Sequence, residues 1–160
     1  MSSGYALLTS LGVCGAAAAL EGVCAGNNVK SFFSSLRLPA YSAPLWVWSI
    51  IGLFYYLIFC FVLYRLLTLN NSSGLRSATI VLVLVMMTVN ALTNYIIFRA
   101  RNLRLSFLVG ALFPILDITL FLMLIQLESL AAWTLIPYLL YRIYAVWWGY
   151  ALWKQNDSGY

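Results

Sequence analysis

The chain has 160 residues, of which 64% are hydrophobic and 8% are charged, and its formal net charge is +5. A soluble domain has about 25% charged residues, so this composition excludes a soluble globular protein and predicts an all-α integral membrane protein. Since a span needs roughly 20 apolar residues, several spans leave no room for a soluble catalytic domain. The basic residues are too dispersed to bind nucleic acid and are typical of membrane flanks.

The sequence carries no recognisable signal for catalysis. The sequence contains no His, which removes the usual general base and the commonest metal ligand. Cys14, Cys24 and Cys60 lie in apolar segments without a CxxC pair, so we interpret them as small packing residues. No P-loop, GxSxG or HExxH motif occurs. We therefore predict no catalytic residue, no metal site and no cofactor.

The first predicted span covers residues 5–26 and is rich in Gly and Ala. A signal peptide is the competing interpretation, but no basic segment precedes this stretch, and small residues favour close helix packing in lipid. We therefore favour a retained helix, with Glu21 as an interfacial residue near its end.

Residues 27–44 form the longest stretch that is not apolar. Two prolines disfavour helix in the residues that precede them. We predict a structured surface loop in which Phe32, Phe33 and Tyr41 anchor the chain at the membrane interface.

Four further spans follow in close succession. We predict them at 45–69, 78–98, 105–127 and 130–153, with a kink at Pro114. Residues 1–160 are thus expected to form one five-helix transmembrane domain.

Basic residues are unequally divided between the two ends of this bundle. One end carries Lys30, Arg37, Arg99, Arg101, Arg104 and Lys154, and the other carries Arg65 and Arg76. The positive-inside rule then places the C-terminus in the cytoplasm, or its organellar equivalent, and the N-terminus outside.

Two ionisable side chains fall inside predicted spans. Asp117 lies ten residues before Leu127, and Arg142 lies twelve residues after Leu130. At 1.5 Å per residue both lie about 15–18 Å from the same short turn, so they are level near the bilayer middle. We expect an ion pair, which is either a structural clasp between two helices or a polar patch in a ligand cavity.

Asn90 and Asn94 are four residues apart and share one helix face at mid-membrane depth. They either hydrogen-bond to a neighbouring helix or bind the polar edge of a ligand.

Aromatic residues are abundant near the C-terminus. Tyr138, Tyr141 and Trp148 either pack or wall a pocket for a flat apolar molecule. The segment with Val146, Tyr150 and Lys154 fits a weak sterol-contact pattern, against the simpler interpretation of a helix-end anchor.

The segment FFSSLRLPAYSAPLWVW, residues 32–48, resembles the signature WYxxLxKPxWxPPxWVF of the translocator protein family. This family is also called tryptophan-rich sensory protein or TspO/MBR. Asn90 matches the family's helix-three asparagine. The segment WTLIPYLLY, residues 133–141, is similar to the family's WxLxxPYLxW, and the likeness continues to Asn156.

The resemblance implies a five-helix fold, usually dimeric, with a cavity that opens under the loop at 27–44. In the family this cavity binds porphyrins, sterols and isoquinoline-carboxamide or benzodiazepine-type drugs. The matching positions are Pro44, Trp46, Asn90, Asn94, Tyr138, Tyr141 and Ala145, to which we add Trp48 and Arg142.

The chain departs from the family at Gly52 and Tyr141, where members often have Trp. Those tryptophans are linked to light-dependent porphyrin breakdown in bacterial members. We therefore predict a membrane receptor or sensor that binds porphyrins or other flat hydrophobic ligands, with membrane lipid and a second copy as partners. A porphyrin-degrading enzyme and a structural, partner-binding membrane protein are the alternatives.

Overall fold

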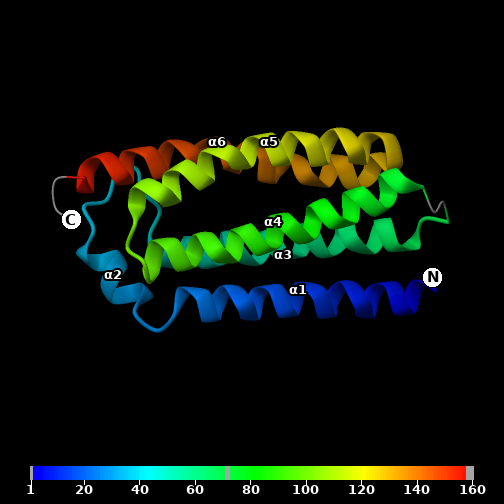
Figure 1. Ribbon diagram of the computed structural model, residues 1–160, viewed down its shortest axis with the longest axis horizontal. Coiled ribbons are helices and arrows are strands. Elements are labelled where there is room, and N and C mark those ends of the chain that lie inside the picture. Colours follow the sequence, from blue (N-terminus) through cyan, green and yellow to red (C-terminus); the bar gives the residue numbers. More distant parts are fainter. Residues whose placement is uncertain (1, 71–72, 158–160) are drawn as a thin grey trace.

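The computed structural model describes residues 2–70 and 73–157, and every regular element within them is a helix. The elements in chain order are α1 (Ser3–Ala25), α2 (Val29–Ser35), α3 (Leu45–Thr68), α4 (Gly74–Phe98), α5 (Leu103–Leu127) and α6 (Ser129–Asn156). The five long helices lie side by side, and each runs antiparallel to the next one along the chain (Figure 1). The two termini therefore lie at opposite ends of the bundle.

The long helices close into a ring. Helix α1 packs on α3 and α4, α4 packs on α5, α5 packs most extensively on α6, and α6 returns to α3. The short helix α2 lies across the end of the bundle at which the chain terminates (Figure 1). A ring of this kind leaves an interior that side chains must fill or leave hollow.

The outer surface is suited to lipid. Large apolar side chains such as Leu53, Ile115 and Ile143 are more than half exposed. Within the described residues, four helices (α1, α3, α4 and α5) are long and apolar enough to cross a membrane. Helix α6 has 28 residues, but its tyrosines, tryptophans and Arg142 make it less hydropathic, and it is not among the four. The chain is therefore an all-helical integral membrane protein, and the count of five spans stays a prediction.

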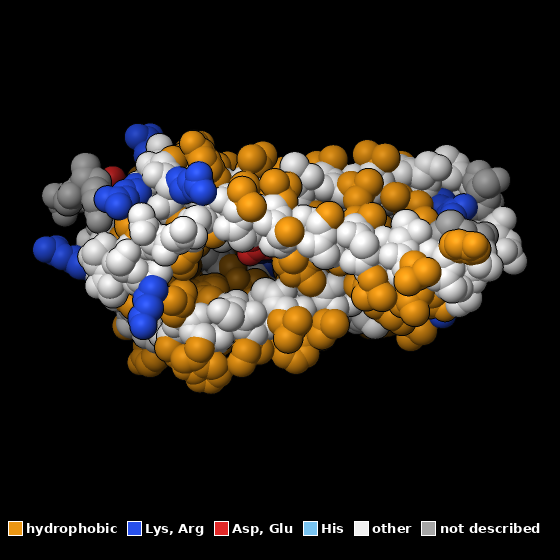
Figure 2. Space-filling model, turned by 90° about the horizontal axis from the view of Figure 1, so that it is seen from below, with side chains coloured by type: hydrophobic (Ala, Val, Ile, Leu, Met, Phe, Trp, Pro, Cys, Tyr) orange, Lys and Arg blue, Asp and Glu red, His pale blue; other side chains and the backbone are white. Residues whose placement is uncertain are grey.

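Lys and Arg side chains gather at the end of the molecule that carries α2 and the C-terminus (Figure 2). The connections α1–α3 and α4–α5 both lie at this end, as the antiparallel order requires. The grouping of basic residues is thus the one that the sequence predicts. Which side of a membrane this end faces stays a prediction.

The predicted spans agree with the helices to within a few residues, but the prediction of a loop throughout 27–44 is wrong. Residues Val29–Ser35 form α2, because both prolines of this stretch lie beyond them, at 39 and 44. Phe32 and Phe33 turn inward rather than towards an interface, and they are 3% and 9% exposed. Tyr41 is 93% exposed and has a positive φ of 64°.

The densely packed part of the hydrophobic core lies in the half of the bundle away from α2. Phe59, Leu66, Met86, Leu124 and Leu135 are fully buried there. Ala131 and Ala132 let α6 approach its neighbours closely. The half nearer α2 is packed differently and contains the cavity described below.

Gly26 ends α1 in a conformation that only glycine adopts readily, with φ 72° and ψ −169°. A Cβ at this position would also lie 2.9 Å from Nε of Arg99, which covers the turn. We predict that Gly26→Ala lowers the free energy of unfolding by about 1–3 kcal/mol. Thermal unfolding in detergent, followed by circular dichroism, measures the effect.

The matched control is Gly12→Ala in the middle of α1, where an added Cβ meets no atom within 4 Å. This variant should be as stable as the parent or slightly more so, because Ala favours helix. Equal melting of the two variants would show that the turn at Gly26 is not constrained as described.

Candidate functional site

A cavity of about 230 Å³ lies inside the ring, in the half nearer α2. All six helices contribute to its lining, from Glu21 on α1 and Phe33 on α2 to Leu152 on α6. Figure 2 shows a hollow on the long side of the molecule, in the half nearer the basic end, with an acidic and a basic side chain inside it. The cavity therefore opens sideways between helices.

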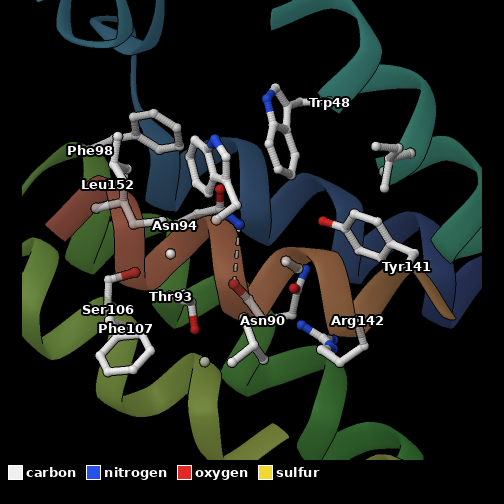
Figure 3. A pocket seen from close by; sticks show the side chains of 18 of the residues that line it. Trp48, Asn90, Thr93, Asn94, Phe98, Ser106, Phe107, Tyr141, Arg142 and Leu152 are labelled. Carbon is white, nitrogen blue, oxygen red and sulfur yellow. Dashed lines mark hydrogen bonds between the residues drawn. The ribbon is translucent and has the colours of Figure 1, made fainter. Parts of the chain in front are cut away.

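Aromatic rings form one wall of the cavity. The ring of Trp48 lies 4.5 Å from that of Trp148 and 6.3 Å from that of Tyr141, measured between centroids. The ring of Phe33 on α2 stacks on that of Trp148, with centroids 6.5 Å apart. Figure 3 shows Trp48 from α3 and Tyr141 from α6 directed into the same space. Flat rings arranged in this way suit a flat apolar ligand.

Asp117 and Arg142 form an ion pair between α5 and α6, with Arg142 Nε 3.0 Å from Asp117 Oδ2. Asp117 is 1% exposed, and the guanidinium group lies over the rings of Phe113 and Tyr138 at 4.4 and 4.8 Å. Arg142 also lines the cavity, whereas Asp117 does not. The pair thus serves both interpretations left open by the sequence: it joins two helices, and it places a guanidinium group at the cavity wall.

Glu21 is the polar residue of the cavity that sequence reasoning misplaced. Its side chain turns into the bundle and accepts hydrogen bonds from Tyr56 Oη (2.5 Å), Asn90 Nδ2 (3.0 Å) and Asn94 Nδ2 (3.1 Å). The interpretation of Glu21 as an interfacial residue is therefore wrong. The signal that pointed to it was the pair of asparagines on one face of α4, which needed a partner on a neighbouring helix.

A model of the TspO/MBR family matches residues 10–154. The chain belongs to the TspO/MBR family. The match covers most of α1, all of α2 to α5, and most of α6, and thus every residue that lines the cavity. Family membership supports a membrane protein of the sensor or receptor type. A search of the curated proteins finds no match to this chain.

Most of the residues predicted to bind ligand line the cavity of this TspO/MBR protein: Trp48, Asn90, Asn94, Tyr138, Tyr141, Arg142 and Ala145. Pro44 and Trp46 do not, and the side chain of Trp46 is 65% exposed. Two residues rotate a helix by about 200°, so Trp46 faces outward when Trp48 faces inward.

The residues of the sterol-contact pattern are separated in the same manner. Val146 lines the cavity, but Tyr150 and Lys154 do not. Tyr150 packs on Trp153 and on Phe107, a residue of α5 that lines the cavity, and Lys154 lies over the ring of Trp153. These contacts fit a helix-end anchor, so the pattern does not form one continuous surface in the cavity.

Residues 36–44 of this TspO/MBR protein, here called the cover, are hydrogen-bonded to the cavity-lining helix α6, and Leu36 among them lines the cavity. Trp148 Nε1 donates to Ser42 Oγ at 2.8 Å, and Tyr144 Oη donates to the Tyr41 carbonyl at 3.1 Å. Asn156 bridges the backbone N–H and C=O of Arg37, both at 3.0 Å. These hydrogen bonds hold the cover to α6, and the Phe33–Trp148 stack holds the preceding helix α2 to α6.

The ion pair predicts a non-additive response to substitution. Asp117→Leu or Arg142→Leu alone leaves a buried charge without a partner and should destabilise the protein by about 3–5 kcal/mol. The double variant removes both charges and should cost far less than either single one. Unfolding in mixed detergent micelles measures all four forms. A double variant that loses the sum of the two single effects would contradict the pairing.

Proposed function

We propose that this TspO/MBR protein is a receptor or sensor that binds a flat hydrophobic molecule in its interhelical cavity. Porphyrin-like tetrapyrroles, sterols and isoquinoline-carboxamide-type compounds are the ligand classes implied by the family resemblance. The observation that carries the proposal is the cavity itself, which joins an aromatic wall of Trp48, Tyr141 and Trp148 to a few convergent polar groups. This combination is typical of ligand sites.

The cavity size separates two modes of binding. At about 230 Å³ it is smaller than the roughly 300–1,000 Å³ of sites that enclose drug-sized ligands. A two-ring aromatic ligand is therefore enclosed, whereas a tetrapyrrole extends beyond the present walls. We propose that a tetrapyrrole displaces the cover at residues 36–44, which gives binding a structural consequence that a sensor requires.

The arrangement in the membrane forms part of the same proposal. Helix α6 has the length of a span and pairs with α5 along its whole course, so we place it as the fifth crossing of a single transmembrane domain. The basic end then faces the cytoplasm or its organellar equivalent. The lateral opening of the hollow lets an apolar ligand enter from the lipid (Figure 2). A homodimer is carried over from the family.

The test is a titration of the purified protein with protoporphyrin IX, followed by Trp fluorescence and porphyrin absorbance in the dark. Saturable quenching is expected, because Trp48 and Trp148 line the cavity. Quenching that rises linearly without saturation would contradict a defined site and would favour a structural, partner-binding role.

Exposing the same samples to light tests the alternative of a porphyrin-degrading enzyme. One observation favours it: Trp48, Tyr141, Tyr144 and Trp148 form a continuous cluster of oxidisable rings. The chain nevertheless has Gly52 and Tyr141 where family members often have Trp, so we expect the porphyrin to persist. Loss of the absorption band faster than with free tryptophan would support the enzyme.

Tyr141→Ala should weaken protoporphyrin IX binding by about two- to tenfold, since one aromatic contact is worth about 0.5–1.5 kcal/mol. The control is Tyr95→Ala, which makes the same change on the outer face of α4, where Tyr95 is 46% exposed and does not line the cavity. This control should bind as tightly as the parent. Equal loss in both variants would place the ligand elsewhere.

A further inference from the structure

The polar cluster of Glu21, Asn90 and Asn94 has an unusual hydrogen-bond character. Both asparagines point their Nδ2 groups at the Glu21 carboxylate, at 3.0 and 3.1 Å. Asn94 Nδ2 also donates to the Asn90 backbone carbonyl at 3.1 Å (Figure 3). A carboxylate is only an acceptor, so the amides are held in this orientation. Both N–H groups of Asn94 and one of Asn90 are thereby used within the cluster.

The cluster keeps hydrogen-bond acceptors that receive no donor from the described residues. Within residues 2–70 and 73–157, no donor is found for the Oδ1 atom of Asn90 or of Asn94. Glu21 uses three of the roughly four lone-pair positions of its carboxylate. All three residues line the cavity. Asn94 Nδ2 uses both of its N–H groups, whereas Asn90 Nδ2 keeps one, so a ligand that meets this cluster finds mainly acceptors.

The charged residues around the cavity support the same conclusion. Among the described residues the two ion pairs are Arg65–Glu128 and Asp117–Arg142, and neither includes Glu21. The charge of Arg142 is balanced by Asp117, 3.0 Å away. Glu21 is therefore left as a negative charge that three neutral donors solvate and no cation neutralises. In a site of low dielectric this charge favours a positive ligand strongly.

We propose that Glu21 makes the cavity selective for a flat aromatic cation or N–H donor, such as an aromatic ammonium compound, over a neutral or anionic ligand of the same shape. The proposal rests on the ligand-binding function given above and names the class that binds best among ligands small enough to be enclosed. A tetrapyrrole extends beyond the present walls, so its carboxylates lie outside the cavity and away from Glu21. The aromatic wall stacks on the ring system, and its Trp48 and Tyr141 faces also attract a cation. The ammonium group lies against Glu21 and the two Asn Oδ1 atoms.

Three two-ring probes of one shape test the selectivity: 2-naphthylmethylammonium, 2-naphthylmethanol and 2-naphthoate. The protein is reconstituted in nanodiscs of uncharged phosphatidylcholine, and binding is measured by isothermal titration calorimetry against empty nanodiscs. We expect the cation to bind at least about tenfold more tightly than the alcohol, since a charged hydrogen bond exceeds a neutral one by about 1.4 kcal/mol or more.

Glu21→Gln removes the charge, and its amide frees Asn90 and Asn94 to turn their donors to the cavity. The preference for the cation should fall to within about twofold, whereas Glu21→Asp should keep most of it. The control is Asp157→Asn, which makes the same change of charge at the exposed end of α6. This control should leave the order of the three probes unchanged.

The outcomes separate this proposal from the one on which it rests. A preference for 2-naphthoate, or a cation preference that survives Glu21→Gln, overturns the role of Glu21 but leaves a ligand-binding cavity. Binding of none of the three probes overturns both. Circular dichroism checks that Glu21→Gln is folded, and if it is not, the order of the probes on the parent protein and on Glu21→Asp decides.

Discussion

The hydrocarbon core of a membrane offers no hydrogen-bond partner to polar groups, so polar side chains inside the bundle depend on one another for pairing. Asp117 Oδ2 and Arg142 Nε pair across α5 and α6 at 3.0 Å, while Asp117 Oδ1 has no hydrogen-bond partner within the described residues. Glu21 of α1 is satisfied by Tyr56 of α3 and by two asparagines of α4. These two clusters join all five long helices in two groups and lie at or beside the cavity. The polar groups that join neighbouring helices are therefore also those that give the cavity its polar character.

The two halves of the bundle differ in how their side chains pack. Small residues and interlocking apolar side chains fill the half away from α2, and this half makes the packing rigid. The half near α2 is hollow, walled by rings and covered by a segment that a few hydrogen bonds hold to α6. A rigid half beside a hollow, covered half allows a ligand to move the cover without unfolding the bundle. This division suits a receptor better than a purely structural protein.

Much of the prediction from sequence depends on helical periodicity and on the depth of each residue along its helix. Counting residues from the turn at Glu128 placed Asp117 and Arg142 level, and they lie in contact. The rotation of each helix about its own axis was harder to predict from the sequence. Glu21 is expected at the interface because it lies near the end of its span. Helix α1 is almost uniformly apolar around its axis, so it shows no preferred face that would indicate otherwise. Trp46 and Trp48 look alike in the sequence, and only the rotation of α3 makes one of them a wall residue. Helix α2 was missed because seven residues between turns carry too little periodic signal.

The central claim is that a flat ligand occupies the space between Trp48, Tyr141 and the Glu21 cluster. The most direct measurement is photo-crosslinking with a diazirine derivative of 2-naphthylmethylammonium in nanodiscs, followed by mass spectrometry of the labelled peptides. Labels are predicted on the lining segments, at residues 45–55 of α3 and 138–149 of α6, and excess unlabelled ligand should compete for them. Labels confined to lipid-facing residues such as Tyr5, Leu122 and Trp133, without competition, would contradict the claim.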